Sequence, residues 1–90
     1  MKDKRYNTIK VLIETNNIKQ LSDVFETLPR TVLAKDIGIN YGRFLRKTAD
    51  LELFDLKEIY RIADFIGVER KSVLDIIHAQ ASKNYKKQNK

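Results

Sequence analysis

Two arginines three positions apart give this sequence its clearest set of hydrogen-bond donors. Arg43 and Arg46 lie in the stretch YGRFLRK. On a helix, steps of about 100° per residue place Arg46 opposite Phe44, with Gly42 on the same outward face and Arg43 beside it. An arginine side chain can donate two parallel hydrogen bonds to guanine O6 and N7, or to a phosphate. This face is therefore suited to binding a nucleic acid.

Three other residues of this stretch each allow two interpretations. Gly42 costs about 1 kcal/mol of helix propensity relative to alanine. A close approach to DNA would explain that cost as well as simple tolerance in a first turn. Leu45 can contact a thymine methyl group or pack on a neighbouring helix. Tyr41 can hydrogen-bond a phosphate or a base, or merely cover the turn.

The elements that must position these side chains lie in the segment TVLAKDIGINYGRFLRK. Ala34 is small enough for two helix axes to approach closely, and Gly38 can take the positive φ that ends a helix. Asn40 is a good N-cap for the helix that follows. We predict helices over 30–37 and 40–49, joined by a tight turn. The pattern is typical of a helix-turn-helix, whose second helix enters the major groove of DNA.

Positive charge is concentrated in two segments of a chain whose formal net charge is +6. Residues 30–47 carry five basic residues and one acidic residue, and residues 83–90 carry four basic residues and no acidic one. Residues 48–82, by contrast, carry four basic and seven acidic residues. Short lysine tails are common solvated chain ends, but the two basic segments together indicate a polyanionic partner.

We therefore predict two sets of contacts to DNA. Base contacts are expected from the start and the outward face of the second helix: Asn40, Tyr41, Gly42, Arg43 and Arg46. Phosphate contacts are expected from the basic segments: Arg30, Lys35, Lys47, Lys83, Lys86 and Lys87. The alternative for the two arginines is an ion pair with Asp50 or Glu52 that serves only the fold.

Two more helices are predicted before this motif. From Tyr6 to Thr15 the apolar residues fit a strand as well as a helix. We choose a helix, because no later segment offers a strand with which it could pair. Asn16 and Asn17 then end it. The apolar spacing that follows predicts an amphipathic helix over 18–28.

Two helices are also predicted after the motif, following a loop over 50–54. Asp55 and Glu58 have the spacing of a capping box before a helix over 56–66, and Gly67 closes that helix. The last helix is expected over 70–83. We expect one helical domain over residues 1–82, followed by a flexible basic tail over 83–90.

The composition predicts a small all-α globular domain. Hydrophobic residues make up 42% and charged residues 33%, and three glycines and one proline favour helices with short connections. No cysteine occurs, which excludes a disulfide framework and a thiolate metal site. We expect neither a membrane span nor a signal peptide. The expected location is the cytoplasm, in association with the nucleoid.

Residues that could perform catalysis are sparse. His78 is the only histidine, and the three serines, Ser22, Ser72 and Ser82, have no base at a recognisable spacing. The sequence contains no glycine-rich phosphate loop, and its carboxylates show no metal-ligand spacing. We expect no enzyme activity, no metal or other cofactor, and no small-molecule substrate.

The run from Arg30 to Ile77 resembles the Cro and lambda-repressor type of helix-turn-helix domain. The matching segments are VLAKDIGIN, YGRFLRK and LKEIYRIADFIGVERKSVLDII. The run PRTVLAKDIGINYGRF is also similar to short helix-turn-helix proteins of Bacteroidetes genomes. The resemblance implies a compact bundle of five or six helices.

Three features depart from that family. Lys47 stands where the family usually has an apolar residue. Arg30 and Thr31 stand where the family often has a glutamine that clamps a phosphate, and either residue can serve there. We therefore add Thr31 to the expected phosphate contacts. The first 17 residues are an addition to the family's domain.

These observations favour a sequence-specific double-stranded DNA-binding protein, a small transcriptional regulator that we expect to form a homodimer. One alternative is a protein-interaction module, antitoxin-like or adaptor-like. Its apolar surface would be made by Tyr6, Ile9, Leu12 and Ile13, provided that the core does not use all four. Another alternative is a nonspecific nucleic-acid binder that uses the basic tail.

Overall fold

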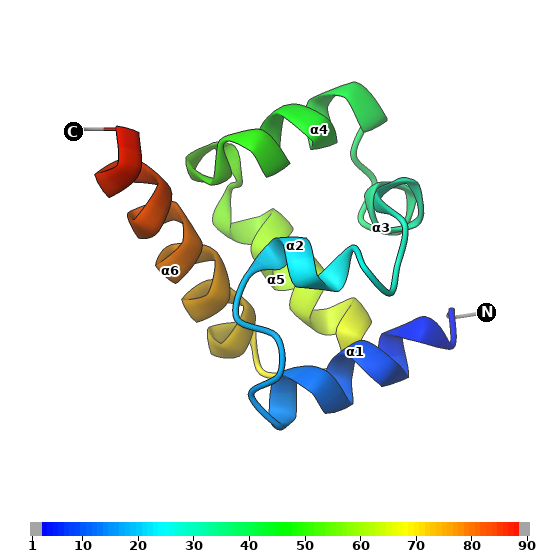
Figure 1. Ribbon diagram of the computed structural model, residues 1–90. Coiled ribbons are helices and arrows are strands. Elements are labelled where there is room, and N and C mark those ends of the chain that lie inside the picture. Colours follow the sequence, from blue (N-terminus) through cyan, green and yellow to red (C-terminus); the bar gives the residue numbers. More distant parts are fainter. Residues whose placement is uncertain (1–2, 89–90) are drawn as a thin grey trace.

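The computed structural model describes residues 3–88, with the side chains of residues 3–83, and this part of the chain is all-helical (Figure 1). The helices are α1 (Arg5–Glu14), α2 (Leu21–Val24), α3 (Arg30–Asp36), α4 (Tyr41–Ala49), α5 (Leu56–Ile66) and α6 (Arg70–Gln88), with a 3₁₀ turn η1 (Leu51–Leu53). The predicted all-α class is confirmed. Within residues 3–88, no helix has the length and apolar character needed to cross a bilayer.

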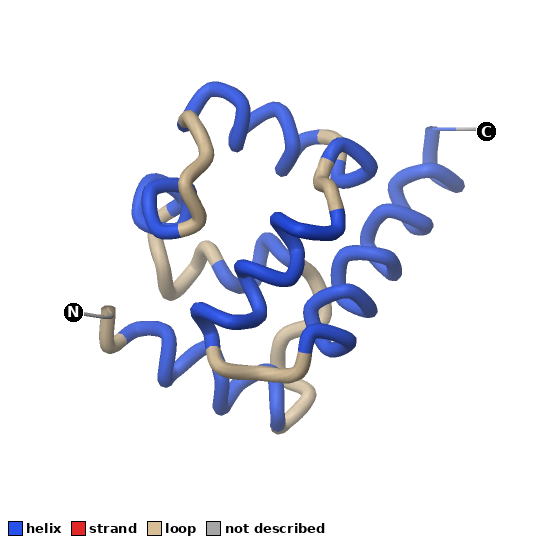
Figure 2. Tube along the Cα trace, turned by 180° about the vertical axis from the view of Figure 1, so that it is seen from behind, coloured by secondary structure: helices blue, strands red, loops and turns tan. Residues whose placement is uncertain are grey.

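The helices surround α5, which packs against both α6 and α1. In Figure 1, α4 lies across the top of the molecule, α1 across the bottom and α6 along one side. Figure 2, seen from behind, shows α5 crossing the middle of the bundle. The largest fully buried side chains come from five of the helices and from Leu28 and Ile37 beside them: Tyr6, Ile9, Val24, Leu28, Leu33, Ile37, Phe44, Ile62 and Ile66.

The N-terminal segment is a helix, as predicted. Asn16 ends it with a φ of 60°, and the Asn17 N–H donates to the Leu12 carbonyl at 2.7 Å. This pair of features is a Schellman motif, which satisfies carbonyls left free at a helix end. Tyr6 and Ile9 of α1 are fully buried. Ile13 is buried as well, and Leu12 is half-buried against the core, so these residues do not form the apolar surface that would bind a protein partner.

The second helix is much shorter than the predicted 18–28. It begins at Leu21 because the Asp23 carboxylate accepts the backbone N–H groups of Lys19 and Gln20, which holds that segment extended. Beyond Val24 the backbone tightens into turns, in which the Thr27 N–H donates to the Val24 carbonyl. Tight turns of this kind still place apolar side chains on the core side.

The segment after α4 and the end of α6 also differ from the predictions. The predicted loop over 50–54 contains η1, because Leu51 and Phe54 are both buried and draw the backbone into a turn. The predicted flexible tail instead continues α6 to Gln88. No glycine or proline occurs after residue 70 to stop the helix.

The predicted capping box of α5 is confirmed. Asp55 Oδ1 accepts the Glu58 N–H at 2.8 Å, and Glu58 Oε1 accepts the Asp55 N–H at 3.0 Å. Gly67 ends the helix with a φ of 88°. The helix therefore starts at the predicted capping box and ends at the predicted glycine.

Tyr6 joins the N-terminal helix to α3. Its hydroxyl donates to Asp36 Oδ2 at 2.7 Å, and its ring lies 5.9 Å from that of Phe65. Burial, and then the hydrogen bond to Asp36, raise the pKa of Tyr6 well above its ordinary value. Through Tyr6, Ile9 and Ile13, α1 is therefore an integral part of the core.

This pKa shift predicts a loss of stability at alkaline pH. Above about pH 10 the unfolded chain loses the Tyr6 proton while the folded chain keeps it, so the unfolding free energy falls by about 1.4 kcal/mol per pH unit. Denaturant unfolding at about pH 8 and pH 11 should show a smaller decrease in Tyr6→Phe than in the parent chain. Tyr41→Phe, at an exposed tyrosine, is the matched control. Equal decreases in Tyr6→Phe and the parent would contradict this assignment.

Candidate nucleic-acid interface

Two short helices and a tight turn form what we call the α3–α4 unit, residues 30–49. The Ile39 N–H donates to the Ala34 carbonyl at 2.9 Å, and Gly38 has a φ of 76°, so α3 ends in a Schellman motif. Asn40 Oδ1 accepts the Arg43 N–H at 3.3 Å and caps α4. Figure 1 shows α3 end-on and α4 side-on, so the two helices cross.

Contacts from elements outside the unit hold its turn in place. Arg61 of α5 donates from Nη1 to the Ile37 carbonyl at 3.1 Å. Tyr6 of α1 holds Asp36 one residue earlier. Neither positioning residue is predictable from the sequence, because Arg61 lies 24 residues from Ile37 and Tyr6 lies 30 residues from Asp36. No local pattern signals such contacts.

The outward face of α4 follows the helical wheel. Phe44 is fully buried, whereas the predicted base-contact residues are exposed, namely Asn40, Tyr41, Gly42, Arg43 and Arg46. Leu45 is 41% exposed, so it does not pack fully on a neighbouring helix. A Cβ added to Gly42 would come within 3.3 Å of Asn40 Oδ1. Glycine therefore also leaves room for the cap.

The arginines of α4 make no ion pair within the described residues. The three ion pairs found there are Arg5–Asp3, Lys47–Glu58 and Arg70–Asp64. The alternative for Arg43 and Arg46 was an ion pair with Asp50 or Glu52, and the described part of the chain contains no such pair. Their guanidinium groups are thus available to a ligand.

Lys47 differs from the other predicted phosphate contacts. Its Nζ lies 2.7 Å from Glu58 Oε1 and 2.8 Å from Oε2, and its side chain is only 12% exposed. The prediction that Lys47 contacts phosphate is therefore corrected, because its ammonium group is already bound within the fold. Lys47 fills the place at which the resembled family has an apolar residue.

The remaining predicted phosphate contacts lie on two parts of the molecule. Arg30, Thr31 and Lys35 are exposed on α3, and the Arg30 guanidinium lies 4.5 Å from the centre of the Phe25 ring. Lys83 is exposed on α6. The side chains of two further predicted contacts, Lys86 and Lys87, lie outside the described residues.

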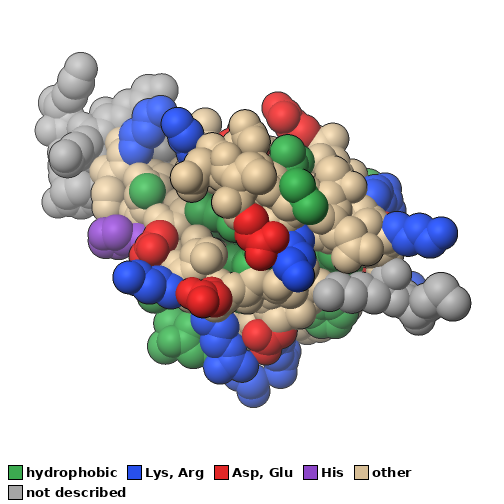
Figure 3. Space-filling view, turned by 90° about the horizontal axis from the view of Figure 1, so that it is seen from below, with side chains coloured by type: hydrophobic (Ala, Val, Ile, Leu, Met, Phe, Trp, Pro, Cys, Tyr) green, Lys and Arg blue, Asp and Glu red, His purple; other side chains and the backbone are tan. Residues whose placement is uncertain are grey.

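Charge is distributed differently at the end of the molecule that carries α1. Figure 3, seen from below, shows acidic and basic side chains intermingled over that face. The C-terminal end of α6, by contrast, lies at the same end of the molecule as α4 in both ribbon views (Figures 1 and 2). The described end of α6 therefore lies on the α4 side of the molecule, away from this mixed face.

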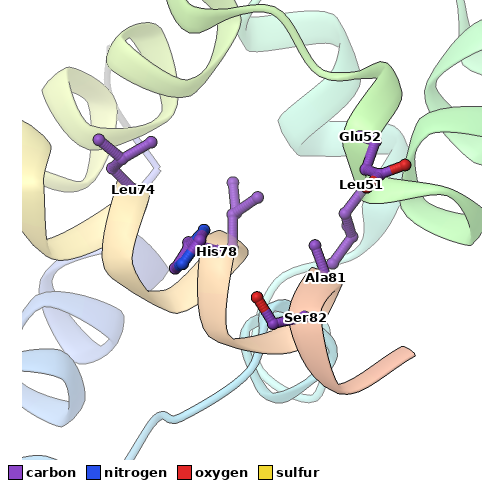
Figure 4. Close-up of a pocket in the computed structure, with 7 residues that line it drawn as sticks. Leu51, Glu52, Leu74, His78, Ala81 and Ser82 are labelled. Atoms are coloured by element: carbon purple, nitrogen blue, oxygen red, sulfur yellow. The ribbon is translucent and has the colours of Figure 1, made fainter. Parts of the chain in front are cut away.

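A groove lies between η1 and α6 (Figure 4). This groove encloses about 490 Å³, and its lining is mainly apolar: Leu51, Glu52, Leu74, Ile77, His78, Ala81 and Ser82. Grooves of such a size and lining accommodate small apolar groups. It contains none of the predicted DNA-contact residues.

The geometry of the turn predicts a difference between two glycine substitutions. Gly38→Ala should lower the unfolding free energy by about 1–2 kcal/mol, because the positive φ of 76° strains any residue with a Cβ. Gly42→Ala should change it by less, because the gain in helix propensity offsets the displacement of the Asn40 cap. Thermal unfolding of both variants measures the difference. A Gly38→Ala chain as stable as the parent would contradict the assigned turn.

Comparison with known proteins identifies no relative of this chain: no family model matches it, and neither a curated protein nor a solved structure is significantly similar to it.

Proposed function

We propose that this protein binds double-stranded DNA with sequence specificity, with α4 in the major groove, and acts as a small transcriptional regulator. The observation that carries this proposal is the outward face of α4. Arg43 and Arg46 are exposed there without an ion-pair partner among the described residues. A helix of about 10–12 Å diameter fits the width of the major groove.

The side chains of this face suggest distinct roles. Arg43 and Arg46 each donate two hydrogen bonds to a guanine. Asn40 caps α4 through its Oδ1, and its amide N–H groups can donate to a base or a phosphate. Tyr41 adds a hydroxyl at the start of the helix, and Gly42 lets the helix backbone approach the DNA closely.

The phosphate contacts come from neighbouring parts of the surface. Arg30, Thr31 and Lys35 of α3 face one strand of the backbone, and Lys83 of α6 extends the basic surface. A single domain of this kind buries roughly 600–1,000 Å² of its surface on DNA. A homodimer on a two-fold site doubles that area, and we propose that oligomer.

The apolar groove supports a second candidate function, an adaptor-like or antitoxin-like module that binds a protein. This function and nonspecific nucleic-acid binding give different results with DNA. A protein-binding module binds no duplex. A nonspecific binder binds all duplexes alike, with a strong dependence on salt.

One test of this proposed function is the salt dependence of duplex binding. Five basic phosphate contacts are predicted, namely Arg30, Lys35, Lys83, Lys86 and Lys87, and they should give a slope of about −4.5 in a plot of log affinity against log salt. Lys35→Ala should reduce that slope by about 1. Lys71→Ala is the matched control, because this exposed lysine lies at the opposite end of α6 from Lys83. An affinity that stays constant between about 50 and 200 mM salt would refute the DNA interface.

Another test of the proposed function separates base contacts from phosphate contacts. Arg43→Ala and Arg46→Ala should each weaken binding to a preferred duplex by about 1–3 kcal/mol and change binding to random duplexes little. Lys35→Ala should weaken both alike. Fluorescence anisotropy with both duplexes gives the specificity ratio, and thermal unfolding monitors the fold. If both arginine variants keep the parent's ratio, α4 does not read the sequence.

A further inference from the structure

The Lys47–Glu58 ion pair joins the last turn of α4 to the first turn of α5. Both oxygens of Glu58 lie within 2.8 Å of Lys47 Nζ, and the two side chains are only 12% and 11% exposed. The Lys47 ammonium also donates to the Leu53 carbonyl at 3.4 Å. Glu58 Oε1 accepts the Asp55 N–H as well, so the α5 cap and the end of α4 share one carboxylate.

An ion pair in such a place is a poor source of net stability. Removing two charged groups from water costs about as much as their attraction returns, and apolar residues of similar size often stabilise equally well. The pair differs from apolar residues because its hydrogen bonds are directional and require a particular placement of both helices. An apolar contact would tolerate sliding and rotation.

The other contacts of α4 do not fix its orientation. Phe44 is the one buried residue of the helix, and a single packed ring leaves rotation about itself open. A nine-residue helix is about 13 Å long, so a rotation of about 10° at its end moves its first turn by about 2 Å. A displacement of that size breaks hydrogen bonds to bases.

We infer that Lys47 and Glu58 are positioning residues that set the orientation of α4 on α5 and thereby determine sequence specificity without touching DNA. The inference rests on the proposed DNA-binding function, although the orientation itself can be measured without DNA. It also assigns a role to Lys47, which the sequence alone predicts to contact a phosphate.

The test compares the pair with an exposed one. Lys47→Met/Glu58→Gln removes the ion pair and keeps an acceptor for the Asp55 N–H. Lys47→Arg keeps the charge, and thus the fold, but changes the geometry. Asp64→Asn/Arg70→Met is the matched control, because that pair is more than half exposed and touches neither end of α4.

The first readout is the specificity ratio, measured with a duplex enriched from a random pool and a scrambled duplex. We expect at least a tenfold loss of this ratio in Lys47→Met/Glu58→Gln and in Lys47→Arg, and an unchanged ratio in the control. If Lys47→Arg keeps the parent's ratio, the inference is wrong. Equal weakening on both duplexes, with a loss of about 1 in the salt slope, would make Lys47 a phosphate ligand and also overturn it.

The second readout needs no DNA. The chain has no cysteine, so Tyr41→Cys and Lys71→Cys can carry spin labels at the start of α4 and of α6. The parent should give one narrow distance distribution, and the two Lys47 variants a shifted or broadened one. An unchanged distribution in both Lys47 variants overturns the inference. A parent that binds no duplex would instead refute the proposed function, while the label distances would still test the orientation.

Discussion

The packing of Phe44 is the contact on which the placement of α4 depends. Its ring meets those of Phe25 and Phe54 edge-on, at centroid distances of 5.8 and 6.0 Å. A helix as short as α4 is not stable alone in water, so it forms only while this ring is packed. Asn40 at its start and the Lys47–Glu58 pair at its end then restrict the rotation that one anchor leaves open.

The α3–α4 unit is not an independent motif, because the residues that hold it come from helices before and after it in the sequence. Tyr6 reaches Asp36 from the N-terminal helix, and Arg61 reaches the Ile37 carbonyl from α5. The position of the proposed DNA surface therefore depends on the helices around it. The N-terminal helix supports α3, and thereby the proposed site, through the bond from Tyr6 to Asp36.

Local chemistry made much of this fold predictable. Asn40, Gly38 and the Asp55 capping box act within four residues, and α4 and α5 begin and end close to where these residues predict. Interactions between distant residues were not predictable. The charge of Lys47 indicated a phosphate contact, because nothing near it in the sequence reveals Glu58 as its partner. The α2 helix is shorter than predicted because the Asp23 carboxylate holds the backbone of residues 19 and 20 extended before it. The α6 helix is longer than predicted because no glycine or proline stops it.

The measurement that tests the central claim most directly is amide chemical-shift mapping by NMR during titration with a short duplex. If the outward face of α4 is the DNA surface, the largest shifts should fall on residues 40–49, with smaller ones at the start of α3. The amides of α1 should change little. Shifts confined to η1 and α6 around the apolar groove, or no shifts at all, would contradict the assignment of α4 as the helix that reads DNA.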